Sequence, residues 1–85
     1  MALRQLEVRA RLRGLAEVRS RKAPALIALG RPADAAREVQ AAADLLAPLV
    51  ASDPQNVQYR ADLACAWLRL GDARRAEGHT NEAIE

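Results

Sequence analysis

Residues 30–51 read GRPADAAREVQAAADLLAPLVA, and this stretch decides the fold class. Its apolar residues recur at steps of three and four, the spacing of one face of an α-helix: Ala35, Val39, Ala42, Leu46, Leu49 and Val50. The triplet Gly30-Arg31-Pro32 is a turn signal. We therefore expect an amphipathic helix that starts after Pro32 and runs to about Ala51, with Pro48 bending its last turn.

A longer helical segment precedes this stretch and runs from about Ala2 to Leu29. Its apolar residues also follow helical spacing, and opposite charges four residues apart, such as Glu17 with Arg21, support an exposed helix. Pro24 removes a backbone donor and clashes with the carbonyl of the preceding turn, so a kink or a break is expected there.

A third segment follows and runs to about Glu77. Asp53 is its expected N-cap, with Pro54 in the first helical position. Gly71 has no side chain, which predicts that a neighbouring helix approaches closely there.

The run Gly78-His79-Thr80-Asn81 predicts a third turn. Residues 80–85 then open a fourth helix, and six residues cannot form a stable helix unaided. We therefore expect the chain to be a fragment cut inside its last helix.

The sequence also contains an internal repeat. A shift of 48 residues places Gly30 on Gly78 and Ala35 on Ala83. Matching turns are more informative than matching leucines, because leucine matches arise by chance in a helical chain. Helix pairs repeated at a fixed period stack and bury one another's apolar faces.

The second copy resembles the tetratricopeptide repeat family. The resemblance rests on an aromatic residue, a Leu-Gly pair, a turn glycine and a small residue: Trp67, Leu70, Gly71, Gly78 and Ala83. Residues 70–78 are similar to lengthened bacterial variants of the repeat. The first copy has Arg19, Lys22 and Ala23 at the Trp, Leu and Gly positions, so it is degenerate.

The resemblance implies an all-α fold of antiparallel helix-turn-helix repeats, a fragment of an α-solenoid with three full helices and a truncated fourth. Residues 1–85 form one domain, with a degenerate first helix pair in residues 1–51 and a truncated second pair in residues 53–85. In this register Trp67 lies in the core of its repeat, with Gly30 and Ala35 as structural positions of the first copy.

Members of this family are partner-binding scaffolds in which the first helix of each repeat lines a concave groove. Carried over to this sequence, the implied groove residues are Glu17, Ser20, Ile27, Cys65, Leu68, Asp72 and Arg75.

Composition agrees with a small helical domain. The 85 residues are rich in Ala and Leu, with one Trp, one Tyr and no Phe. Cys65 is the single cysteine, which excludes an internal disulfide, and we expect it to be a small core residue. The sequence has no apolar run long enough for a membrane span, and its N-terminus is too charged for a signal peptide, so a cytoplasmic protein is expected.

Charge is unevenly distributed. Residues 1–22 carry a net charge of +5 and residues 23–85 carry −3. An Arg-rich helix can bind nucleic acid or an anionic protein. Glu7 and Glu17 interrupt the basic run, and no aromatic residue is interleaved for base stacking. Nucleic acid is therefore disfavoured, and a solvated helix face is the favoured interpretation.

No pattern indicates catalysis. His79 is the only histidine and is expected to be a solvated turn residue. Since no phosphate loop or metal-ligand spacing is present, we expect no enzyme activity, no cofactor and no metal. The expected function is a scaffold that binds a peptide or protein segment or self-associates. The alternatives are nucleic-acid or anionic-partner binding through the Arg-rich N-terminal helix, and a regulatory or accessory region of a larger signalling protein or enzyme.

Overall fold

The computed structural model describes residues 3–84, with side chains described for residues 4–78. It contains three helices: α1 (Leu3–Ala28), α2 (Pro32–Ser52) and α3 (Val57–Ile84). No strand occurs among the described residues, so the all-helical fold class is confirmed.

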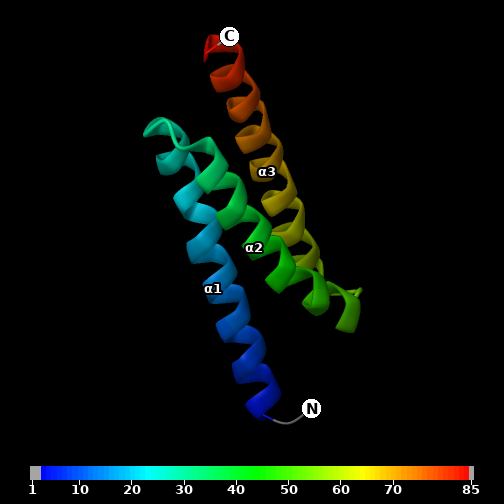
Figure 1. Ribbon diagram of the computed structural model, residues 1–85. Helices are drawn as coiled ribbons and strands as arrows, with labels where there is room; N and C mark the ends of the chain where they lie inside the picture. Colours follow the sequence, from blue (N-terminus) through cyan, green and yellow to red (C-terminus); the bar gives the residue numbers. More distant parts are fainter. Residues whose placement is uncertain (1–2, 85) are drawn as a thin grey trace.

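The three helices run up, down and up, with α2 packed against both of the others (Figure 1). Two hydrogen bonds join α1 directly to α3: Arg13 Nε donates to Asp62 Oδ2 at 2.7 Å, and Arg69 Nη1 donates to Ser20 Oγ at 2.8 Å. Each bond joins residues 49 positions apart. Because the offset is constant, α1 and α3 are parallel and in register.

The turn between α1 and α2 depends on Gly30, which has a φ of +76°. Its N–H donates to the Ile27 carbonyl at 3.0 Å, and the Arg31 N–H donates to the Leu26 carbonyl at 2.8 Å. This bonding pattern ends a helix with one left-handed residue, which glycine adopts without strain. Pro32 then opens α2, where its missing N–H costs nothing. The turn predicted at this position is confirmed.

The N-cap prediction for α3 is wrong. Asp53 instead ends α2, because its N–H donates to the Leu49 and Val50 carbonyls at 3.1 and 3.3 Å. Pro54 lies in the following turn, and Asn56 caps α3 by accepting the Tyr59 N–H on Oδ1 at 3.1 Å. Asn56 Nδ2 also donates to Asp53 Oδ2 at 3.3 Å, which links the two helix ends.

The predicted turn at Gly78 and the truncated fourth helix are also wrong, because α3 continues through Gly78 to Ile84. Only Gly30 has a positive φ among the described glycines. A single glycine costs a helix only about 1 kcal/mol, and the residues before Gly78 include good helix formers. Pro24 does not break α1 either, and α2 continues through Pro48.

The core consists mainly of alanine. Among the described side chains, eight of the twelve buried hydrophobic residues are alanines, and they come from all three helices: Ala16, Ala23, Ala35, Ala36, Ala42, Ala43, Ala66 and Ala73. Val39 is the largest fully buried side chain. Small side chains let the backbones of packed helices approach closely.

The same buried alanines correct the predicted repeat. The buried pairs Ala16 with Ala66 and Ala23 with Ala73 are 50 positions apart, and the buried and half-buried positions between them also match at this offset. A shift of 48 residues instead places buried Ala16 on exposed Ala64. Two residues correspond to a rotation of about 200° around the helix axis. Residues paired at an offset of 48 instead of 50 therefore have side chains that point in nearly opposite directions.

Gly30 and Gly78 should respond oppositely to the same substitution. We expect Gly30→Ala to lower the free energy of unfolding by about 1 kcal/mol, because alanine resists a positive φ. We expect Gly78→Ala to raise it by about 0.5–1 kcal/mol, because alanine favours a continuous helix. An added Cβ meets no atom within 4 Å at either site, so steric clashes do not contribute to the difference in stability between the two variants. Urea denaturation followed by circular dichroism measures both values, and a destabilised Gly78→Ala variant would contradict a continuous α3.

Candidate functional site

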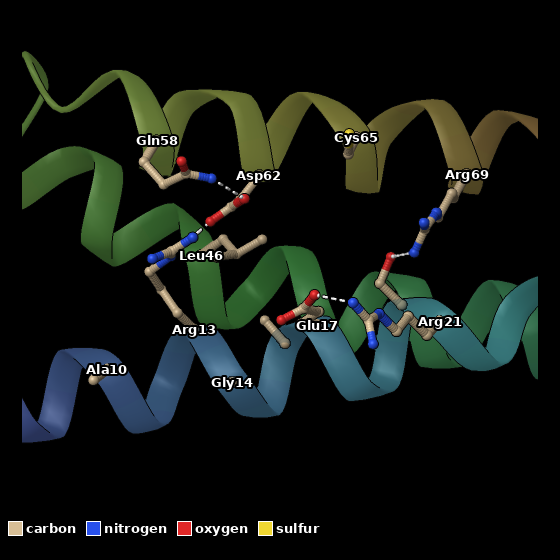
Figure 2. A pocket seen from close by; sticks show the side chains of 12 residues that line it. Ala10, Arg13, Gly14, Glu17, Arg21, Leu46, Gln58, Asp62, Cys65 and Arg69 are labelled. Atoms are coloured by element: carbon tan, nitrogen blue, oxygen red, sulfur yellow. Dashed lines mark hydrogen bonds and ion pairs between the residues drawn. The ribbon is translucent and has the colours of Figure 1, made fainter.

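A groove of about 440 Å³ lies between α1 and α3, with α2 behind it (Figure 2). One wall comes from the face of α1 that turns toward α3, and the other comes from α3. Buried Leu46 of α2 lies at its floor. The lining residues are Ala10, Arg13, Gly14, Ala16, Glu17, Ser20, Arg21, Leu46, Gln58, Asp62, Cys65 and Arg69.

Two side-chain contacts cross the groove, and we call them bridges. The first is the ion pair between Arg13 and Asp62 (Figure 2). The Arg13 guanidinium also lies over the Tyr59 ring, with 5.9 Å between its carbon and the ring centroid. Gln58 Nε2 donates to the other oxygen of Asp62 at 3.0 Å. Both charged side chains are partly exposed, so we expect this ion pair to contribute no more than about 1 kcal/mol.

The second bridge joins Arg69 of α3 to Ser20 of α1. Ser20 is the only buried polar residue among the described side chains, and its hydroxyl accepts the bond. Arg69 has no carboxylate partner among the described residues. Since a guanidinium carries five N–H donors, most of its donors remain available to a ligand or to water.

Between the two bridges the groove is open. Gly14, Glu17 and Cys65 are exposed there, and Glu17 is held by Arg21 at 2.5 Å as the sequence predicts for residues four apart. The prediction that Cys65 is a core residue is wrong. Cys65 lies one position before buried Ala66, and one step along a helix rotates a side chain by about 100°, out of the core and into the groove.

Three of the predicted groove residues line this groove, namely Glu17, Ser20 and Cys65. The other four do not. Ile27 packs against the core, Leu68 is 71% exposed, and Asp72 pairs with Arg75 at 2.6 Å on an exposed part of α3.

The residues of the predicted repeat signature have mixed outcomes. Ala35 is fully buried and Leu70 packs against the core. Trp67 is 49% exposed, so its predicted core position is wrong. Gly71 is exposed and nothing lies within 4 Å of its added Cβ, so no helix approaches it closely. Ala83 and His79 lie beyond the residues whose side chains are described.

Sequence reasoning did not single out the residues that cross the groove. Arg13 stands four residues before Glu17, the spacing of an ion pair along one helix, but in the structure it bonds Asp62 of α3. Arg69 received no role. The sequence holds part of the signal, because Ala16 and Ala23 recur as Ala66 and Ala73 at an offset of 50, one residue from the offset of 49 at which the two bonds join α1 to α3.

The chemistry of the groove suits binding. It holds three guanidinium groups, from Arg13, Arg21 and Arg69, and two carboxylates, from Glu17 and Asp62. Among the described residues, no three His, Cys, Asp or Glu side chains gather in a way that could hold a metal ion. The walls can therefore donate and accept hydrogen bonds along a bound chain, with an excess of donors near Arg69.

A second hollow of about 540 Å³ lies at the turn between α1 and α2, next to Glu77 of α3. Its carboxylate at Asp34 accepts hydrogen bonds from Arg37 and from Arg31. The bond from Arg37, followed by the bond from Arg31, lowers the pKa of Asp34 below its ordinary value of 3.8. These polar groups are thus already paired with one another.

The lowered pKa of Asp34 predicts a pH effect. A carboxyl group with a lower pKa in the folded state stabilises the fold above its unfolded pKa and loses that contribution as pH falls through the folded pKa. We expect the NMR titration midpoint of the Asp34 carboxyl to lie below 3.8 and to rise in Arg37→Gln. Arg60 is an exposed arginine on α3, whereas Asp34 is on α2, so the control Arg60→Gln should leave the midpoint of Asp34 unchanged. An unmoved midpoint in Arg37→Gln would contradict the cause.

No described helix combines the length and the apolar character that crossing a membrane requires. No family model matches this chain, and comparisons with curated proteins and with solved structures find no match either.

Proposed function

We propose that the chain is a binding scaffold that holds a peptide or protein segment in the groove between α1 and α3. The observation that carries this proposal is the groove, which is tied across by two bridges and remains open between them at Gly14, Glu17 and Cys65. A site formed before the ligand arrives reduces the ordering cost of binding.

The bound segment is best taken as extended. An extended backbone needs partners for its N–H and C=O groups, and the walls offer amide, guanidinium and carboxylate groups. Arg69, with donors left over after its bond to Ser20, supplies the strongest of these contacts.

We also propose that the arrangement is of the tetratricopeptide type. Its support is the helix order, with a glycine turn at Gly30 between antiparallel α1 and α2 and with α3 returning parallel to α1. The continuous α3 departs from the family pattern, which has a turn where Gly78 stands here.

Blocking the groove tests the binding proposal. A random peptide library displayed on phage is selected on the immobilised chain, and the selected peptides are then titrated against two variants by fluorescence anisotropy. Gly14→Trp fills the groove, whereas Gly71→Trp makes the same change on an exposed part of α3 outside it. Neither added Cβ meets an atom within 4 Å, so both variants should fold.

We expect Gly14→Trp to weaken binding by about tenfold or more and Gly71→Trp to leave it unchanged. Recovery of no peptide, or equal binding by both variants, would overturn the proposal. Peptides that contain acidic residues should also lose affinity in Arg69→Gln, whereas Arg74→Gln, whose partner Glu77 lies outside the groove, should not affect them.

Self-association is a second candidate function, favoured by exposed apolar side chains on α3. Val57 is 75% exposed, Leu68 71% and Trp67 49%. Such residues often mark contact surfaces. We expect a dimer at high concentration in analytical ultracentrifugation and a monomer in the Trp67→Ser, Leu68→Ser double variant. A wild-type chain that stays monomeric would contradict this.

A further inference from the structure

One line of exposed residues runs along α1. Eight residues recur at alternating steps of four and three: Arg4, Val8, Arg11, Leu15, Val18, Lys22, Ala25 and Leu29, which directly follows the last residue of α1. We call this line the α1 seam. A mean spacing of 3.5 residues is the spacing that lets two helices wind around each other.

All eight residues of the α1 seam are exposed, and the apolar ones among them are substantially so. Val8 is 46% exposed, Leu15 45% and Val18 55%. The seam lies opposite the groove, because Leu15 follows Arg13 by two residues and therefore points about 200° away from it. Arg13 faces α3, so the seam faces away from α3.

The seam also contains cations that form no ion pair with any described residue. Arg13 and Arg19 pair with carboxylates of the other helices, and Arg21 pairs with Glu17. No described residue forms an ion pair with Arg4, Arg11 or Lys22, and these three lie on the seam. Arg9 also forms no ion pair with a described residue and lies off the seam, so three of the four unpaired cations of α1 stand on the line of exposed apolar residues.

The form of the seam indicates a helix as its partner. A membrane-surface helix needs a broad apolar face with its cations at the borders. Here the line is narrow and the cations lie within it. Phosphates of a nucleic acid would neutralise the cations but leave Leu15 and Val18 uncovered. A partner helix that follows the same spacing covers both kinds of residue.

The charges indicate that this partner is acidic and is not a second copy of the chain. Two parallel copies of α1 would place each seam cation against its equivalent. Two antiparallel copies of α1 can be aligned so that Leu15 of each copy faces Val18 of the other. In that alignment Arg11 of each copy faces Lys22 of the other, so two cations meet at two places. Like charges in a helix seam are destabilising, and opposite charges select the partner.

We propose that the α1 seam binds a separate amphipathic helix of complementary charge. Its apolar residues cover Val8, Leu15, Val18 and Leu29, and its Glu or Asp side chains face Arg4, Arg11 and Lys22. The complex is a two-stranded coiled coil along α1, formed on the side of the molecule opposite the groove.

A pair of synthetic peptides tests this proposal with the unaltered chain. Each has about 28 residues in four heptads, with Leu and Val at the apolar seam positions. One peptide carries Glu at the three positions that face the seam cations, and the other carries Lys there. We expect calorimetric titration to show binding of the Glu peptide, weakened by added salt, and binding of the Lys peptide reduced by about tenfold or more. Equal binding of the two peptides, or binding of neither, would overturn the proposal.

Charge-matched variants locate the site. Arg11→Glu changes a seam cation, and Arg60→Glu makes the same change at an exposed arginine of α3. We expect only Arg11→Glu to weaken the Glu peptide by about tenfold. The Leu15→Ser, Val18→Ser double variant should abolish binding, whereas Leu68→Ser should not. Equal losses in Arg11→Glu and Arg60→Glu would overturn the seam as the site.

Two further ligands separate the other classes of partner. Vesicles of phosphatidylglycerol and a short DNA duplex are titrated under the same conditions. Tighter binding of either than of the Glu peptide would overturn the proposal. The groove variant Arg69→Gln, on α3, should bind the Glu peptide normally, so a failure of the groove proposal and a failure of this one are distinguishable.

Discussion

Ala42→Glu should unfold the protein. Ala42 is fully buried on α2, where the helices on both sides contribute alanines to the core. A glutamate there adds volume to a close-packed site and buries a carboxylate in the apolar core. We expect a loss of about 4 kcal/mol or more, against a total stability of roughly 5–10 kcal/mol for a domain of this size. The melting temperature should fall by about 20 °C or more, or no transition should remain.

The matched control is Ala47→Glu, on the same helix. Ala47 is exposed, so the same side chain enters water and should change stability by no more than about 0.5 kcal/mol. Thermal melting followed by circular dichroism measures both variants. Equal melting of the two would show that α2 does not lie between α1 and α3. The same reasoning applies to Ala35→Glu near the start of α2, since Ala35 is also fully buried.

Tyr59→Ala should produce the second-largest loss. Tyr59 is the one large aromatic side chain in the core, at 9% exposure, and it lies in the first turn of α3. Removing the ring leaves a cavity and removes the support under the Arg13 guanidinium. We expect a loss of about 3 kcal/mol, which corresponds to a fall in melting temperature of about 15 °C.

Two further variants separate the contributions of the ring. Tyr59→Phe keeps the ring and should stay within about 1 kcal/mol of the wild type. A double-mutant cycle with Arg13→Gln should give a coupling of about 0.5–1 kcal/mol, which is the contribution of the cation above the ring. A coupling of zero would show that Arg13 is held by Asp62 alone. Full stability in Tyr59→Ala would contradict the burial of the ring.

The sequence predicted the helical segments because their apolar spacing and their strongest turn are local. Gly30 ahead of Pro32 ends one helix and starts the next whatever the rest of the chain does. Gly78 looked the same in the sequence, but no proline follows it, and a glycine among helix formers does not end a helix. The predicted fourth helix failed for this reason.

The groove was predictable only in part, because its geometry depends on register. Of the residues predicted for a groove, Glu17, Ser20 and Cys65 line the groove between α1 and α3, whereas the other four lie outside it: Ile27, Leu68, Asp72 and Arg75. The bridges at Asp62 and Arg69 join residues 49 positions apart. A pairing at that distance follows from how far each helix slides along α2, which no local pattern encodes.

The α1 seam shows the opposite case: its spacing is visible in the sequence, but the sequence does not predict that this line is exposed. α1 carries two apolar lines, one through Leu12 and Ala16 and one through Leu15 and Val18. Helical periodicity predicts both and cannot tell which is covered. In the structure Ala16 is buried and Leu12 packs against the core, whereas Leu15 and Val18 are exposed.

The alanine contacts of the core also determine how rigid the molecule is. Alanine has no rotamers, so folding freezes no side-chain torsions at these positions. It follows that the spacing of α1 and α3 from α2 is fixed by Cβ atoms attached directly to the backbones. A ligand that needs a wider channel cannot obtain it by side-chain rearrangement. It has to move a whole helix as a rigid body, and that displacement stretches the bonds at Asp62 and Ser20 together.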